Sequence, residues 1–276
     1  MVKSLINIIH SLNIPKVILR FIMMNFLDLR TITNLLLTVK EMNVLDNYSK
    51  DLLTKAKCGF IWNCDRGYLT VSKWLYYLND INIFADGSDA FSLACNNGHL
   101  DVAKWLYSLG DIDIHAEYDC AFRWACQSGH LTVAQWLYSV DEYSHCETGK
   151  HQSKINIHVN NEYAFRWSCN FGHLAVAQWL YYFGGVNIHA DSEYAFQEAC
   201  TNGHLTVAKW LYSLGGVNIH ADNEYAFTRA CQNGHLATAK WLYVLGDIYM
   251  HAYDGCVFKF SPQHVLDWID TLITKN

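Results

Sequence analysis

One sequence motif recurs along this chain, and its spacing restricts the possible fold more than any other feature. The motif begins with Ala-Cys, continues with Gly-His-Leu and ends with Trp-Leu-Tyr, and a clear copy runs from Ala94 to Tyr107. Six copies, the first with Tyr in place of His, are centred on a glycine: Gly67, Gly98, Gly129, Gly172, Gly203 and Gly234. The numbers of successive glycines differ by 31, 31, 43, 31 and 31, so one copy carries a 12-residue insertion, within residues 141–154. A fixed period of this size is the signature of a solenoid of stacked repeats.

Within each repeat, the residues predict two short helices and an extended segment. In one copy, residues 222–224 form a polar turn and residues 225–232 form the first helix. Gly234 ends this helix in the left-handed conformation that is common at helix C-caps. Residues 236–243 form the second helix, because their apolar side chains recur at helical spacing. A segment such as residues 217–221 is extended and leads into the next turn.

This order of helix, glycine loop, helix and extended finger resembles the ankyrin repeat. The matching sequence motifs are Ala-Cys, Gly-His-Leu, Val-Ala-Lys-Trp-Leu and, at residues 217–222, Val-Asn-Ile-His-Ala-Asp. Two features depart from that family. Residues 194–197 read Tyr-Ala-Phe-Gln where Thr-Pro-Leu-His is usual, and the period is 31 rather than about 33, which predicts a shorter turn between finger and helix. The sequence of the repeat motif is also similar to that of ankyrin proteins of giant DNA viruses that infect amoebae.

The resemblance covers residues 56–254 and implies an all-α ankyrin solenoid of six repeats. Residues 255–276 lack a Gly-His pair but keep an apolar stripe, with Asp267 and Asp270 on the opposite side of the closing helix. We expect this segment to be a degenerate repeat that caps the array.

Residues 1–55 do not follow the repeat and predict three short helices. Ile14-Pro15-Lys16-Val17-Ile18, a Leu-Asp pair at residues 27–28 and a later Leu-rich run resemble an F-box. The pattern departs from that family at Ile14, where Leu is usual, and at Met42 or Val44, where Trp is usual. The resemblance implies docking to a Skp1-type adaptor through Ile14, Pro15, Val17, Ile18 and Leu35. The alternative is a helical cap on the first repeat, which solenoids need.

Composition restricts the partner and the compartment. Residues 1–55 hold seven Lys/Arg and four Asp/Glu, and the remainder holds 13 and 22, which disfavours nucleic acid as the partner of the repeats. Six of the ten cysteines occupy one repeat position, about 10 Å apart, too far for disulfides. Reduced cysteines suit a cytoplasmic protein, in the host cytoplasm if the protein is viral. No segment is long and apolar enough for a signal peptide or a membrane span.

The 14 histidines raise the question of a metal site. The loop histidines are separated by one repeat each, and we expect them to hydrogen-bond loop carbonyls and brace neighbouring repeats: His99, His130, His173, His204 and His235. The finger histidines are also expected to be structural: His115, His158, His189, His220 and His251. In the insertion, His145, Cys146 and His151 could bind a metal, but a tolerated surface insertion is the favoured interpretation. We therefore predict no metal and no cofactor.

The candidate binding residues lie on the first helices and the turns before them. Arg123-Trp124 and Arg166-Trp167 break the regularity of the repeats, and Trp and Arg are favoured at binding hot spots. Random drift with partial burial is the alternative. The turns carry a ladder of acids, including Glu193 and Glu224, which would face a partner with a basic rim. The tryptophans of the second helices are expected to pack in the core.

No nucleophile and base recur around one site, and no glycine loop follows a strand to hold a phosphate, so we do not expect an enzyme. The preferred function is recognition of a host or viral protein by a monomer. With the F-box resemblance, this becomes recruitment of substrates to a host cullin-based ubiquitin ligase. The rival is a plain ankyrin scaffold or inhibitor with no link to a ligase.

Overall fold

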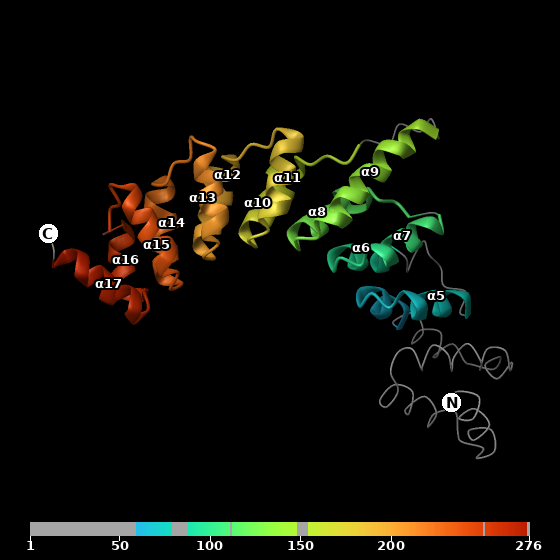
Figure 1. The fold of residues 1–276 in the computed structure, drawn as a ribbon, viewed down its shortest axis with the longest axis horizontal. Coiled ribbons are helices and arrows are strands. Elements are labelled where there is room, and N and C mark those ends of the chain that lie inside the picture. Colours follow the sequence, from blue (N-terminus) through green and yellow to red (C-terminus); the bar gives the residue numbers. More distant parts are fainter. Residues whose placement is uncertain (1–58, 79–87, 111, 148–153, 251, 275–276) are drawn as a thin grey trace, which may run out of the picture.

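A computed structural model describes residues 59–78, 88–110, 112–147, 154–250 and 252–274. Within these ranges the regular structure is helical, and helices pair in the chain order of Figure 1. The first helices of the pairs are residues 59–65, α6 (Ser88–Asn96), α8 (Ala116–Gln127), α10 (Val159–Asn170), α12 (Ala190–Thr201), α14 (Ala221–Gln232) and α16 (Ala252–Phe260). The second helices are α5 (Leu69–Leu78), α7 (Leu100–Ser108), α9 (Leu131–Glu147), α11 (Leu174–Gly184), α13 (Leu205–Ser213), α15 (Leu236–Leu245) and α17 (Gln263–Ile273). The all-α solenoid predicted from the repeat is confirmed.

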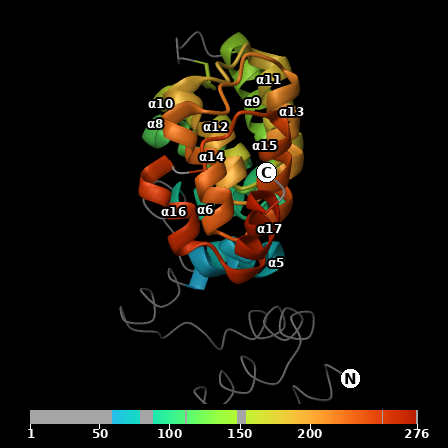
Figure 2. The same ribbon diagram turned by 90° about the vertical axis from the view of Figure 1, so that its left-hand side faces the viewer.

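The two sets of helices form two layers, seen end-on in Figure 2. First helices of neighbouring repeats pack closely against one another, and each second helix packs mainly on the first helix of its own repeat. Neighbouring first helices pack more closely together than neighbouring second helices do, so the array is tighter along the layer of first helices. The first helices therefore line the concave side of the array.

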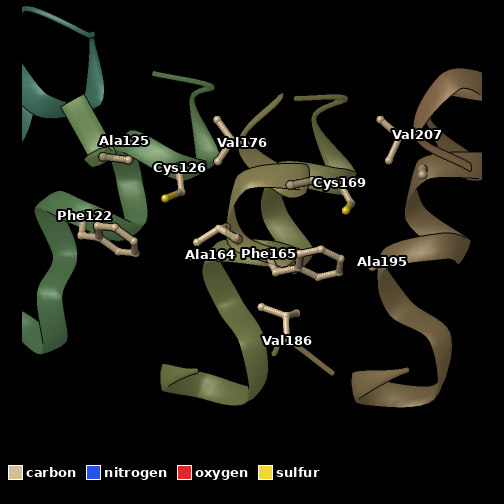
Figure 3. Packing of buried hydrophobic residues seen from close by; sticks show 14 of the residues in the cluster. Phe122, Ala125, Cys126, Ala164, Phe165, Cys169, Val176, Val186, Ala195 and Val207 are labelled. Carbon is tan, nitrogen blue, oxygen red and sulfur yellow. The ribbon is translucent and has the colours of Figure 1, made fainter. Parts of the chain in front are cut away.

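The core is a set of columns, each contributed by one position of the repeat. The phenylalanine column is almost completely buried and consists of Phe60, Phe91, Phe122, Phe165, Phe196 and Phe227. The cysteine column is buried and reduced, as predicted, and consists of Cys64, Cys95, Cys126, Cys169, Cys200 and Cys231. Figure 3 shows Phe122 and Cys126 of one repeat beside Phe165 and Cys169 of the next, with the small residue Ala164 between the two rings. Large and small side chains thus alternate along a continuous core.

The tryptophans of the second helices join neighbouring repeats, in agreement with the predicted packing role. Trp179 meets Phe122 and Tyr138 of the preceding repeat, with ring centroids 6.1 Å away in both cases. The angle between the rings of Trp179 and Tyr138 is 85°, which is the edge-to-face geometry that aromatic pairs prefer. The same contacts recur at Trp105, Trp136, Trp210 and Trp241.

The loop glycines and histidines interlock successive repeats. Gly129 has φ of 81°, and a Cβ built there would lie 2.7 Å from Cγ and Cε1 of His173 in the next repeat. The imidazoles of His130, His173 and His204 hydrogen-bond the backbone of Asn96, Gln127 and Asn170, each in the preceding repeat. At these three positions the contacts are of the kind expected of a histidine that braces neighbouring repeats.

Each described finger joins its first helix through a turn of left-handed backbone. In α12, Asp191, Ser192 and Glu193 have φ of 58°, 56° and 66°, and the same conformation recurs at the start of α8, α10 and α14. Asp, Asn, Ser and Glu fill almost all of these positions, and Asn and Asp tolerate this region better than most residues. This compact turn accounts for the short connection that the repeat period predicted.

The insertion within residues 141–154 is only partly a loop. Helix α9 continues to Glu147, so the first half of the insertion prolongs a second helix, where the sequence predicted a polar loop throughout. The side chains of His145, Cys146 and His151 lie outside the described residues. The same holds for all of the F-box-like residues, Ile14, Pro15, Val17, Ile18 and Leu35.

The array ends on α16 and α17, which pair like the helices of a repeat. Val265 and Ile269 are buried against the preceding repeat, while Asp267 and Asp270 are exposed. His264 Nε2 lies 3.0 Å from the carbonyl oxygen of Gly234, so a histidine covers this loop although the Gly-His pair is missing. None of the helices in the described ranges is both long and apolar enough to cross a lipid bilayer.

Candidate protein-binding surface

The position two residues after each core phenylalanine points away from the core and varies along the array. We call this series the inner column: Trp62, Leu93, Trp124, Trp167, Glu198 and Arg229. Trp62 is 51% exposed and Arg229 is exposed, whereas the four residues between them are half-buried. Its N-terminal part is apolar and its C-terminal part is charged. The inner column therefore presents side chains whose chemistry changes from repeat to repeat, while the core beneath them stays nearly constant.

An aromatic stripe runs along α10 at the centre of this face. Trp167 stacks on Phe171 with ring centroids 5.7 Å apart and approaches Tyr163 at 5.6 Å. Tyr194 of the next repeat extends the stripe, since its ring centroid lies 6.4 Å from that of Trp167. Phe171 is 46% exposed, so the stripe reaches the surface. Sequence reasoning singled out Trp167 but missed Phe171, which stands where the other described repeats have polar residues.

The two predicted arginines are already engaged within the array. The Nε–H of Arg123 donates a hydrogen bond to the carbonyl oxygen of Tyr118, and an Nη2–H of the same guanidinium donates one to the carbonyl oxygen of Glu117. Both donor–acceptor distances are 2.8 Å. Its guanidinium lies over the ring of Tyr163 in the next repeat, 4.9 Å from the ring centre. Arg166 repeats the arrangement: it bonds the carbonyls of residues 160 and 161, forms an ion pair with Asp191 and lies over Tyr194. The geometry gives both arginines a bracing role between turn and neighbouring repeat.

The placement of Glu193 and Glu224 corrects the expectation that both belong to an exposed acidic ladder. They are 8% and 5% exposed. One oxygen of Glu193 lies 2.9 Å from His189 Nδ1 and accepts the backbone N–H of Asn218 in the next finger at 3.3 Å. Glu224 makes the same contacts with His220 and Tyr249 N. A carboxylate that joins its own histidine to the next finger cannot also form the rim of an interface.

This pairing also explains the finger histidines, which were predicted to be structural without a known partner. His115 and His158 pair with Asp119 and Glu162 in the same way. The signal was available in the sequence, because an acid follows four of the five finger histidines, all but His251, after four residues. Within the described ranges, no group of three or more His, Cys, Asp or Glu side chains is arranged to hold a metal ion.

Glu198 is the acid of the inner column and occupies a half-buried position on the concave side. Its carboxylate accepts a hydrogen bond from Asn170 Nδ2 at 3.2 Å and another from Tyr225. Burial raises the pKa of Glu198, although the hydrogen bond from Tyr225 and the charge of Arg229 act in the opposite direction. A further cation placed beside this carboxylate would therefore be favourable.

Exposed lysines are commoner on the second helices and exposed acids on the fingers and turns, although Arg229 and Lys259 lie on first helices and Asp101, Asp267 and Asp270 on second helices. Lysines recur on the second helices at Lys104, Lys209 and Lys240. Exposed acids gather on the fingers and turns: Asp113, Glu117, Asp191, Asp222 and Asp247. Because Arg123 and Arg166 tie these turns to the first helices, the acids lie along one edge of the concave face. The predicted acidic edge thus exists, but residues other than Glu193 and Glu224 form it.

Comparison with known proteins agrees with this architecture. A family model described as ankyrin repeats (3 copies) matches residues 60–150 and 163–252. The chain is similar to the ankyrin repeat domain of human ASB11, with 18% identity, 74% of this chain and 97% of that chain covered, and a TM-score of 0.48. It is also similar to an ankyrin repeat family protein from Legionella pneumophila, with 19% identity, 82% of each chain covered and a TM-score of 0.40. No curated protein sequence matches. Because the family match covers well over half of its residues, the chain belongs to the ankyrin repeat family.

Proposed function

We propose that this protein is a protein-recognition module whose concave, first-helix face binds a host or viral protein. The observation that carries the proposal is the contrast between a repeated core and a varied inner column. Phenylalanine recurs at the core position in every described repeat from residue 60 to 227, whereas the inner column changes from Trp and Leu to Glu and Arg. Variation on one face of a regular scaffold suits selective binding, and exposed aromatic residues suit its centre.

A site-specific crosslinking experiment tests this proposal. A photoreactive phenylalanine analogue replaces Phe171 on the concave side or Val244 on a second helix, which is 80% exposed. We expect the full-length protein to crosslink a discrete partner in lysate of infected or host cells from position 171 and not from position 244. Crosslinking from position 244 alone would place the interface on the second helices and would contradict the proposal.

The second candidate function is substrate recruitment to a cullin-based ubiquitin ligase, in which the segment of residues 1–55 acts as an F-box. The support is the residue pattern Ile-Pro-x-Val-Ile followed by Leu-Asp and a Leu-rich run. The rival is a scaffold or inhibitor in which residues 1–55 only cap the array.

Binding of purified Skp1-type adaptor to the full-length protein separates these candidates. The F-box interpretation expects Pro15→Ala combined with Ile18→Asp to abolish adaptor binding while the melting temperature of the repeats is unchanged. Lys16→Ala serves as the matched control and should bind as wild type does. If the double variant destabilises the repeats, the capping interpretation is preferred, and if wild type does not bind the adaptor, the link to a ligase fails.

A further inference from the structure

The concave face changes from apolar to acidic over three successive repeats. Trp124 on α8 and Trp167 on α10 occupy the inner column, and Phe171 extends the aromatic surface beside Trp167. In the next repeat, Glu198 on α12 takes the same position. The order of side chains along this part of the face is therefore aromatic, aromatic, carboxylate.

The spacing of these positions matches an extended polypeptide. Neighbouring packed helices lie about 10 Å apart. An extended segment in the polyproline II conformation advances about 3.1 Å per residue and has three residues per turn, so three of its residues span about one repeat. Such a segment lying along the first helices would present every third side chain to the inner column.

The carboxylate at the Glu198 position favours a basic side chain in the bound segment. The Glu198 carboxylate is held by Asn170 and Tyr225 in a half-buried position, where burial raises its pKa. Asp222, exposed in an adjoining turn, adds negative charge on the same side of the array, whereas Asp191 is already paired with Arg166. The exposed lysines Lys104, Lys209 and Lys240 lie on the second helices, and the cation that acts on Glu198 is Arg229 at the next inner-column position.

We propose that the concave face recognises an extended segment of the partner that has two apolar side chains three residues apart and a Lys or Arg three residues beyond them. The apolar side chains contact Trp124 and the Trp167–Phe171 pair, and the basic side chain pairs with Glu198. This assignment rests on the proposed function and narrows its partner from any folded protein to a basic, extended segment. The three-residue spacing of the contact side chains is the same for either direction of the bound segment.

Selection from a phage library of random 12-residue peptides on the full-length protein tests the assignment. We expect selected peptides to share two apolar residues at a spacing of three, followed or preceded at the same spacing by Lys or Arg. Trp167→Ala should raise the dissociation constant of a selected, fluorescein-labelled peptide at least tenfold. Val244→Ala, on a second helix, should leave it unchanged. Circular dichroism should show an unchanged helical content for both variants.

A charge reversal provides a readout that loss of folding cannot imitate. Selection on Glu198→Lys should replace the basic position of the consensus with Asp or Glu and keep the two apolar positions. Asp270→Lys, with the same change of charge on α17, should keep the wild-type consensus. Peptides without the spacing, peptides insensitive to Glu198→Lys, or no selected peptide at all would overturn the assignment. In each of those cases, crosslinking of a partner from position 171 would still support the proposed function, so the two failures are distinguishable.

Discussion

At the scale of single residues, each loop glycine satisfies two constraints that both exclude a side chain. At Gly129, the backbone has φ of 81°, and the space that a Cβ would fill is occupied by the imidazole of His173. The first constraint costs a β-branched residue of the order of 1–3 kcal/mol. The second would displace a histidine that joins two repeats.

The variant Gly129→Val measures both effects. We expect the free energy of unfolding to fall by more than about 2 kcal/mol, because strain and displacement of His173 add. Lys104→Ala, an exposed change on a second helix, should stay within about 0.5 kcal/mol of wild type. Chemical denaturation gives both values, and equal midpoints for the two variants would contradict the role of the loop.

The loop histidines predict how stability depends on pH. Burial lowers the pKa values of His130, His173 and His204, and a neighbouring imidazole contributes in each case. Their folded pKa values therefore lie below the unfolded value of about 6.5. The unfolded chain binds more protons in this window, so their contribution is complete above about pH 6.5 and is lost as pH falls toward the folded pKa values.

Thermal melts at pH 7.5 and pH 5.5 test this sign. We expect the melting temperature of wild type to be lower at pH 5.5. His173→Asn should melt earlier at both values but show a smaller difference between them, because one titrating group has been removed. The difference between the two proteins reports the titration of His173 together with its coupling to His130 and His204. A wild type that is more stable at pH 5.5, with an equal change in the variant, would contradict the prediction.

At the scale of elements, the left-handed turns are the least conventional parts of the repeat. Three successive residues with positive φ are unfavourable in isolation, so other contacts must hold them. In α12 these contacts come from Glu193, which joins His189 to the backbone of Asn218. The turn is thus stabilised by the repeat that follows it, and it connects finger, first helix and neighbouring repeat in one network.

Removal of this carboxylate should have a larger effect than removal of an exposed one. We expect Glu193→Ala to lower the free energy of unfolding by about 1–3 kcal/mol, since an imidazole and a backbone N–H lose their partner. Asp270→Ala, an exposed position on α17, is the matched control and should change it by about 0.5 kcal/mol or less. Hydrogen exchange of the Asn218 amide gives a local readout, and unchanged protection in Glu193→Ala would contradict the bridging role.

The elements also show how far the sequence predicts the structure. The helices, the glycine loops and the core columns follow from periodicity, because each copy repeats the same burial pattern. The left-handed turns do not, since a run such as Asp191-Ser192-Glu193 is equally compatible with an ordinary polar turn. The burial of Glu193 and Glu224 depends on contacts with the finger of the following repeat. For the same reason, Arg123 and Arg166 were predicted as contact residues although their donors are used by backbone carbonyls and tyrosine rings.

At the scale of the whole molecule, one unbroken core runs through the described repeats, and its cysteines report on its integrity. Burial raises the pKa of every thiol in the column, to about 11 at Cys64 and about 12 at Cys231. A thiol reacts as the thiolate, so these groups are protected both by burial and by their protonation state.

Titration with a thiol reagent at pH 8 tests this protection. We expect the six column cysteines to react slowly in the folded protein and rapidly in denaturant. Mass spectrometry of the labelled peptides assigns each site. Cys64, in the first described repeat, should label before Cys126 and Cys169, because burial raises its pKa less than theirs and more of its thiol is ionised at pH 8. Rapid labelling of central cysteines without denaturant would contradict a continuous core.

The interlock between each glycine and the histidine of the next repeat has a consequence for how such a chain can change length. The repeats centred on Gly98, Gly129, Gly172 and Gly203 each carry both halves of the contact, a glycine that receives an imidazole and a histidine that covers a glycine. A duplicated copy of one whole unit, placed between two existing units, would meet suitable partners on both sides without any compensating substitution. Only the end of the row needs a different solution, which His264 supplies at Gly234. Recombination between copies could therefore lengthen or shorten the concave face in whole steps, and could reorder its recognition residues, while every junction stays the same.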